Sequence, residues 1–208
     1  MNVLRHAIGL RLHYVLVGSG SGRLGRIDPP EVPEGYSARM VNFEDLVHFV
    51  AKVPDLSRDF LEVAFSRGDI CVASFFDNEL VGFSFQSQVR AEVSAQLDIL
   101  VPAGFRYTYK TWIHSDHRRR NLSQLQGYVR HCSRDTKSRD RGIWYVETSN
   151  YPSLLHSYRH PNDRTLKMGY VGWYSFFGRH IPFRSSWARW LGVELLSRQD
   201  TRTRLLIQ

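Results

Sequence analysis

The sequence contains very little cysteine, with only two in 208 residues. Cys71 lies inside an apolar run, and Cys132 lies in a helical pattern. Cysteines in such surroundings are typical of small buried hydrophobic residues, and they predict neither a disulfide framework nor a metal site. No stretch approaches the ~18 uninterrupted apolar residues of a membrane-spanning helix. Residues 1–17 mix basic with apolar positions and lack a small-residue cleavage pattern, so no signal peptide is expected. These absences favour a cytoplasmic protein.

Motifs of several enzyme classes are also missing. The chain has no Gly-x-Ser-x-Gly elbow of a Ser-His-Asp hydrolase and neither glycine pattern of a Rossmann or P-loop nucleotide site. It also has no metal knuckle and no paired aromatic-rich strands of a nucleic-acid-binding module. The formal net charge of +8 nevertheless favours an anionic partner. A basic nucleic-acid-binding protein therefore stays open as an alternative.

The order of predicted elements indicates one α/β (α+β) domain with a mixed sheet. We expect an N-terminal extension that ends in a Gly/Ser/Pro-rich linker at 1–35, a main domain at 36–184 and a basic tail at 185–208. Strands and helices are expected from apolar spacing, and the segment 89–101 could be either a strand or an inserted loop. The strands are predicted at 36–41, 70–76, 80–86, 105–113, 142–148 and 168–177, and the helices begin near 43, 57, 121 and 150.

One connection in this pattern has a direct chemical meaning. Phe105 to Ile113 alternates apolar and polar residues as a strand does, and Leu122, Leu125 and Val129 recur at helical spacing. A basic turn joins this strand to this helix. Free backbone N–H groups and the positive end of the helix dipole would meet at that turn, which predicts a site for a phosphate or diphosphate.

The residues of this turn resemble the acyl-CoA signature of the GNAT acyltransferase superfamily. That signature has a hydrophobic strand end, often Val-x-Pro, followed by Glu-Tyr-Arg-Gly-x-Gly-x-Gly (or Ala). The matching positions are Ile113, Ser115, Asp116, His117 and Arg118, followed by Arg119, Asn121 and Ser123 where the family has glycine, glycine and glycine or alanine.

A second resemblance lies further along the chain. Asn150 and Tyr158 are eight residues apart, and Lys167-Met168-Gly169-Tyr170 follows the family's Lys-x-Gly-Phe pattern after six or seven extra residues. In the family this tyrosine protonates the departing CoA thiolate or holds the sulfur. The resemblance gives Tyr158 that role.

The resemblance implies a GNAT-like mixed, mostly antiparallel central sheet flanked by helices, with splayed central strands. It implies N-acyltransferase activity with acetyl-CoA or another acyl-CoA as donor, acetyl being favoured, an amine of a small molecule or peptide as acceptor, and no metal. The CoA-binding residues would be the strand end, the basic turn and the following helix start: Trp112, Ile113, His114, Arg118, Arg119, Arg120, Asn121, Leu122, Ser123 and Asn150.

The general base is less clear, because the strand from Phe105 to Ile113 carries no carboxylate. Glu147, His114 and Asp98 are candidates, and an amine that arrives deprotonated would need none. Aromatic residues could line the acceptor pocket, although core packing explains the same alternation more simply. These aromatic residues are Phe83, Phe85, Tyr107, Tyr109, Trp173 and Phe176.

Three further points stay open at the level of sequence. The chain could bind acyl-CoA without catalysing transfer, and it could form a homodimer. The tail with Trp187 and Trp190 could pack on the domain, contact a second subunit or touch an anionic membrane surface; packing on the domain is favoured.

Overall fold

The computed structural model describes residues 8–18, 28–54, 56–94, 96–133, 141–159, 165–176 and 179–197. The chain divides into two units. Unit 1 comprises residues 1–22, 88–107 and 140–208, and unit 2 comprises residues 23–87 and 108–139. The strand β7 (Phe105–Ile113) begins in unit 1 and ends in unit 2.

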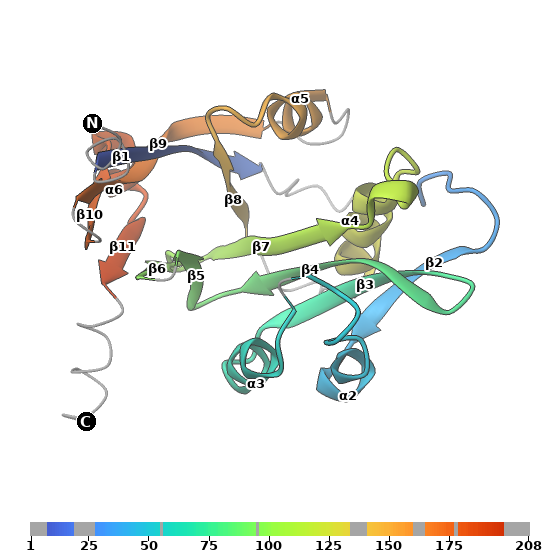
Figure 1. The fold of residues 1–208 in the computed structure, drawn as a ribbon. Helices are drawn as coiled ribbons and strands as arrows, with labels where there is room; N and C mark the ends of the chain where they lie inside the picture. Colours follow the sequence, from blue (N-terminus) through green and yellow to red (C-terminus); the bar gives the residue numbers. More distant parts are fainter. Residues whose placement is uncertain are drawn as a thin grey trace, which may run out of the picture. The chain divides into compact units, whose positions relative to one another are not determined.

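Unit 2 contains four neighbouring strands in the order β7-β4-β3-β2. The strands β2 (Tyr36–Val41), β3 (Ile70–Phe76) and β4 (Glu79–Ser87) pair antiparallel. Figure 1 shows α2 (Phe43–Val47) and α3 (Arg58–Ser66) on one side of these strands and α4 (Leu122–Cys132) on the other. Their buried side chains, among them Phe83, Phe85, Leu46, Leu61 and Leu122, form the core of this unit.

Local sequence signals account for several of these elements. The side chain of Asn42 accepts a hydrogen bond from the Asp45 amide (2.9 Å), and the Asp45 carboxylate accepts one from the Asn42 amide (2.9 Å), which is a capping box at the start of α2. The strands predicted at 70–76 and 80–86 are confirmed as β3 and β4, which form an antiparallel hairpin. Its turn residues Asp77 and Asn78 have φ values of 47° and 69°, which short polar side chains tolerate and a two-residue hairpin turn requires.

Unit 1 contains five neighbouring strands in the order β10-β9-β1-β8-β7. Only the first residues of β7 belong to it, and they pair parallel with β8 from Phe105↔Arg141 to Tyr107↔Ile143. The other pairs are antiparallel. The other strands of this sheet are β1 (Ile8–Gly18), β8 (Arg141–Glu147), β9 (Thr165–Phe176) and β10 (Arg179–Arg184). Unit 1 also contains the helices α5 (Tyr151–Arg159) and α6 (Ser186–Trp190).

A second, three-stranded sheet in unit 1 has the order β11-β6-β5. The segment 89–101, ambiguous in sequence, forms its β5 (Arg90–Ser94) and β6 (Leu97–Leu100). The third strand, β11 (Glu194–Ser197), comes from the segment predicted as a basic tail. Of that tail, residues 186–190 and 194–197 are therefore regular structure, and residues 198–208 lie outside the described part.

The N-terminal segment is the largest difference from the predicted order of elements. Instead of an appendage, residues 8–18 form β1, which lies between β8 and β9. Val15, Leu16 and Val17 of this strand are buried. The sheet needs these apolar side chains to complete its interior, so this part of the predicted extension belongs to the sheet of unit 1.

The predicted fold class is confirmed: a mixed α/β fold with a large, mostly antiparallel sheet and flanking helices. The splay of the central strands concerns the placement of the two units and stays a prediction. None of the helices in the described residues is long and apolar enough to cross a membrane.

Candidate functional site

The turn between β7 and α4 has an unusual backbone. After β7 ends, the short 3-10 helix η1 (Ser115–His117) leads into residues 118–121. Arg119 has a φ of 63° and Asn121 a φ of 57°. Left-handed backbone is uncommon for residues other than glycine, and an arginine adopts it only at a cost in strain. These two residues stand at the positions where the resembling motif has glycine, so the chain keeps the left-handed turn without the glycines.

The start of α4 offers backbone N–H groups to this turn. The first amides of any helix have no partner inside the helix, and α4 has 11 residues, long enough for a substantial dipole. Within the described residues no side chain caps it: the amide nitrogen of the Asn121 side chain donates instead to the carbonyl oxygen of Glu31 (2.9 Å). The amides of Leu122 and Ser123 are therefore suited to an anion.

Positive charge surrounds the same turn. Arg118, Arg119 and Arg120 are exposed, and none of them forms an ion pair within the described residues. The Arg118 Nε donates to the carbonyl oxygen of Ile113 (3.3 Å), and the Arg120 guanidinium lies 5.6 Å from the centre of the Tyr36 ring. The arginines thus bring charge to the turn, and no carboxylate of the described residues pairs with them.

The end of β7 presents its two edges differently. The His114 N–H donates to the Val81 carbonyl of β4 (2.9 Å), and the Trp112 carbonyl oxygen lies 3.1 Å from where a Cβ on Gly82 would be. Because successive residues of a strand direct their backbone groups to opposite edges, the Ile113 N–H points away from β4. Of the three strand-end residues named for CoA binding, Trp112, Ile113 and His114, Ile113 is thus the one whose N–H is directed away from β4.

A left-handed residue also interrupts β7 itself. Lys110 has a φ of 48° in the middle of the strand. Such strained positions persist only where the surrounding structure holds them, and they cluster at functional sites. The left-handed backbone of Lys110 supports a functional role for the end of β7. The sequence did not predict it, because no residue type near Lys110 marks a break in the strand pattern.

The predicted catalytic side chains fall in different units. His114 belongs to unit 2, and its Nδ1 accepts a hydrogen bond from the Asp116 N–H (3.4 Å), which leaves the proton of the neutral ring on Nε2. Glu147 belongs to unit 1, where its Oε1 accepts from the Arg11 Nη1 (2.6 Å). Asp98, the third base candidate, is buried in β6.

The residues of the second resemblance lie on or before α5. The Asn150 side chain accepts a hydrogen bond from the Ser153 N–H (3.3 Å), so it caps the first turn of this helix as its position before Pro152 suggests. Tyr158 is in α5, but its side chain lies outside the described part of the structure. The roles of both residues stay predictions.

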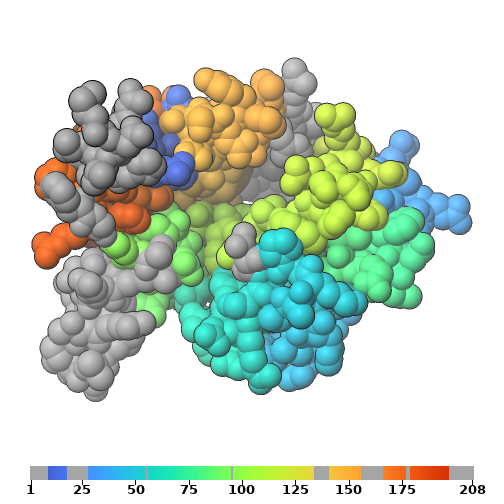
Figure 2. Space-filling view, viewed as in Figure 1, coloured from blue at the N-terminus to red at the C-terminus, as the bar shows by residue number. Residues whose placement is uncertain are grey.

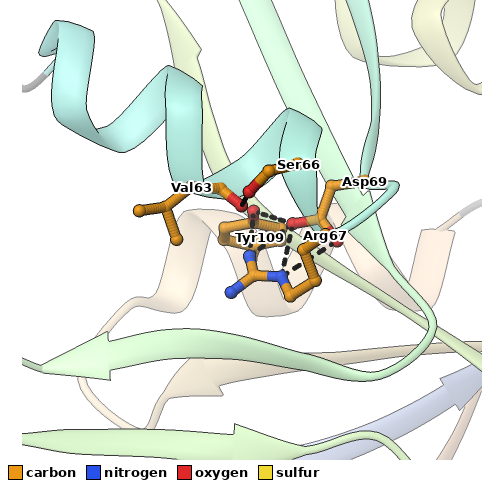
Figure 3. A network of polar contacts seen from close by, with 5 residues as sticks. All are labelled: Val63, Ser66, Arg67, Asp69 and Tyr109. Carbon is orange, nitrogen blue, oxygen red and sulfur yellow. Dashed lines mark hydrogen bonds and ion pairs between the residues drawn. The ribbon is translucent and has the colours of Figure 1, made fainter.

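A buried polar cluster next to β7 was not predicted (Figure 3). The Asp69 carboxylate is buried and accepts from the Arg67 Nε (3.1 and 3.2 Å) and from the Tyr109 hydroxyl. The Arg67 Nη2 also donates to the Tyr109 hydroxyl (2.9 Å). Burial, and next the hydrogen bond to Asp69, raises the pKa of Tyr109. The cluster ties the α3–β3 connection to β7 one residue before the left-handed Lys110.

The aromatic residues considered for an acceptor pocket are mostly core. Phe83, Phe85 and Tyr109 in unit 2 are buried, as are Tyr107 and Trp173 in unit 1. Phe176 is exposed. Burial of the first five fits core packing, the simpler of the two interpretations, and their role in lining an acceptor pocket stays a prediction. The described residues also hold no group of three or more His, Cys, Asp or Glu side chains that could bind a metal ion.

Comparison with known proteins gives matches in structure alone. No protein-family model and no curated protein sequence matches the chain. A Drosophila protein of solved structure has a TM-score of 0.56 and 16% identity over 85% of this chain and 55% of its own. At this identity the match shows a shared fold.

Several other similar structures are GCN5-related N-acetyltransferases, the family whose signature the basic turn resembles. A tandem GNAT protein from the clavulanic acid biosynthesis pathway has 17% identity and a TM-score of 0.47, over 77% of this chain and 54% of its own. A GCN5-related N-acetyltransferase from Sphaerobacter thermophilus has 13% identity and a TM-score of 0.47, over 94% of this chain and 54% of its own. The chain thus spans about half the length of each of these structures.

Proposed function

We propose that the protein is an acyl-CoA-dependent N-acyltransferase that moves an acetyl group from acetyl-CoA to an amine of a small molecule or peptide. The observation that carries this proposal is the left-handed backbone of Arg119 and Asn121 before an uncapped helix. A sequence that merely carried basic residues here would have no reason to adopt the turn for which the family's signature uses glycine.

The residues of the turn fit the diphosphate of coenzyme A. The amides of Leu122 and Ser123 and the positive end of the α4 dipole favour an anion, and the guanidinium groups of Arg118, Arg119 and Arg120 supply positive charge. The Ile113 N–H, directed away from β4, is suited to donate to a thioester carbonyl oxygen.

Acyl transfer from the thioester to the amine requires a proton donor for the sulfur and a proton acceptor for the amine. Coenzyme A, when bound, supplies an acyl group activated as a thioester. The amine nitrogen forms a bond to the acyl carbon as the carbon–sulfur bond breaks, the Tyr158 hydroxyl gives its proton to the sulfur, and the amine loses one proton. The attacking amine is neutral, and Glu147, His114 or a water molecule accepts the proton that it loses.

Titration calorimetry with acetyl-CoA and with a long-chain acyl-CoA tests the binding step. We expect the wild-type chain to bind and the Arg118→Ala, Arg120→Ala double variant to bind at least about tenfold more weakly, because charge-assisted hydrogen bonds contribute about 1.5–3 kcal/mol each. The preferred acyl length reports the donor. Failure of the wild-type chain to bind either donor would overturn the proposal and favour the nucleic-acid alternative.

A second set of variants tests the backbone of the turn directly. Asn121→Gly should keep acetyl-CoA affinity, whereas Asn121→Val should lose it, because a β-branched side chain does not tolerate a φ of 57°. Asn78→Val is the matched control: it places the same strain at a φ of 69° in the β3–β4 turn, so it should lower stability without lowering affinity. Equal losses of affinity in the two valine variants would contradict a role of the turn in binding.

Turnover separates an enzyme from a binding protein. With an amine that the chain acetylates, Tyr158→Phe should lower kcat strongly and leave the affinity for acetyl-CoA unchanged. Affinity for acetyl-CoA without acetylation of any amine in a broad panel would instead support a GNAT-like protein that binds acyl-CoA without catalysis.

A further inference from the structure

Three neighbouring strands of unit 1, β10, β9 and β1, leave a row of large apolar side chains exposed. Leu10 of β1 lies opposite Tyr174 of β9, which lies opposite Ile181 of β10. Their exposed fractions are 56%, 49% and 54%. Phe176, two residues along β9 and therefore on the same face, is exposed as well. We call Leu10, Tyr174, Phe176 and Ile181 the outer face.

The opposite face of the same strands is packed. Val171 and Trp173 of β9 are buried, and the Trp173 ring stacks between His13 of β1 (5.2 Å) and His180 of β10 (5.8 Å). An antiparallel sheet with one packed face normally turns polar residues to water on the other. The outer face departs from that rule, and contiguous exposed apolar surface of this kind marks interaction sites.

The segment 165–190, which contributes three of the four outer-face residues, carries charge of one sign in its own sequence, although its Arg184 pairs with Glu194 of β11 (3.9 Å). Residues 165–190 include Lys167, Arg179, Arg184 and Arg189 but no aspartate or glutamate. Arg179 lies opposite Phe176 in the β9–β10 register, and Arg179 and Arg189 have no ion-pair partner within the described residues. Side chains of this segment, coloured orange to red, reach the molecular surface in Figure 2. The charge is therefore complementary to an anionic partner.

We propose that the outer face docks on an anionic lipid bilayer. Aromatic residues with polar ends, aliphatic side chains and basic residues together match the boundary between headgroups and acyl chains. The aliphatic Leu10 and Ile181 have no ring to stack on a base, which disfavours nucleic acid. A second copy of the chain would bring the same basic, acid-free segment against itself, which disfavours a homodimer through this face.

Vesicle sedimentation tests the proposal with the full chain. We expect binding to vesicles of phosphatidylcholine with phosphatidylserine, weaker binding as salt is raised, and little binding to phosphatidylcholine alone. The double variant Tyr174→Ser, Ile181→Ser should lower the affinity about tenfold or more, since it removes two apolar side chains from the contact. Val63→Ser on α3 is the matched control, because Val63 of unit 2 is exposed to 55% and should not affect binding.

A charge variant tests whether weaker vesicle binding could result from loss of folding instead of loss of the contact. Arg179→Glu changes one exposed residue, should keep the wild-type circular dichroism and Tm, and should weaken binding to the phosphatidylserine vesicles. The proposal is overturned if the wild-type chain binds neither kind of vesicle, or if Val63→Ser weakens binding as much as the outer-face variant. It is also overturned if the outer-face variant abolishes dimers in sedimentation velocity or binding to single-stranded RNA while leaving vesicle binding intact.

Discussion

Each unit holds polar atoms of one ionisable side chain out of contact with water, and the two side chains differ in their hydrogen-bond partners. In unit 2 the Asp69 carboxylate is surrounded by donors from Arg67 and Tyr109. In unit 1 His13 lies flat on Trp173, with ring planes 18° apart, and its buried Nδ1 has no hydrogen-bond partner among the described residues. When a buried charge has hydrogen-bond partners, removing either member of the pair costs stability. A histidine ring whose buried nitrogen has no such partner is instead difficult to protonate. The difference predicts which substitutions, and which changes of pH, each unit tolerates.

The largest expected effect comes from breaking the cluster in unit 2. Asp69→Ala leaves the largely buried Arg67 guanidinium without its carboxylate, and we expect the free energy of unfolding to fall by about 3–5 kcal/mol, measured by urea unfolding. Glu62→Ala is the control. Glu62 pairs with Arg58 on the exposed face of α3, so its loss should cost about 0.5 kcal/mol or less. Equal costs for the two variants would contradict the comparison.

A smaller effect is expected from removing one donor and keeping the ion pair. Tyr109→Phe keeps the ring, which packs near Phe60 and Phe85, and deletes only the hydroxyl that donates to Asp69. We expect a loss of about 1–3 kcal/mol in the same unfolding measurement, because the deleted hydrogen bond has a charged acceptor. Combined with Asp69→Ala, the tyrosine substitution should cost less than it does alone, because the hydroxyl then keeps only the hydrogen bond that it accepts from Arg67 (2.9 Å). Additive losses would show that the hydroxyl acts independently of the carboxylate.

The sequence was sufficient where the deciding contacts are local. The capping box of Asn42 and Asp45, the hairpin turn at Asp77 and Asn78, and the basic turn between a strand and a helix each involve residues a few positions apart. Such contacts leave a signature in the order of residue types. They account for most of the elements and for the location of the candidate anion site.

The sequence was insufficient where distant segments decide. Val17 of β1 pairs with Ile143 of β8 and Leu166 of β9, and no local pattern announces strand pairing over more than a hundred residues. The Asp69 cluster likewise joins positions 40 residues apart, Asp69 and Tyr109. Aromatic alternation looks the same in a packed core and in a pocket wall, so pattern alone could not separate the two.

The smallest expected effect is the pH dependence of stability that His13 contributes in unit 1. Burial lowers the pKa of His13; the nearby Glu147 carboxylate partly offsets this, and Arg11 adds to it. As pH falls through about 6.5, the unfolded chain takes up a proton at this position before the folded chain does. Protonation then favours unfolding, so the stability held at neutral pH declines until the pH has passed the lowered pKa of the folded state.

His13→Phe removes this titration and keeps a ring to stack on Trp173. The chain has nine histidines, so the measured quantity is the difference between wild type and variant. We expect the Tm of the wild-type chain to fall more steeply than that of His13→Phe between about pH 7.5 and about pH 5.5. The effect should be modest, because the Glu147 carboxylate stabilises the protonated ring. Identical slopes would mean that His13 takes up its proton as easily in the folded chain as in the unfolded one, and the contrast between the two units would then reduce to the Asp69 cluster alone.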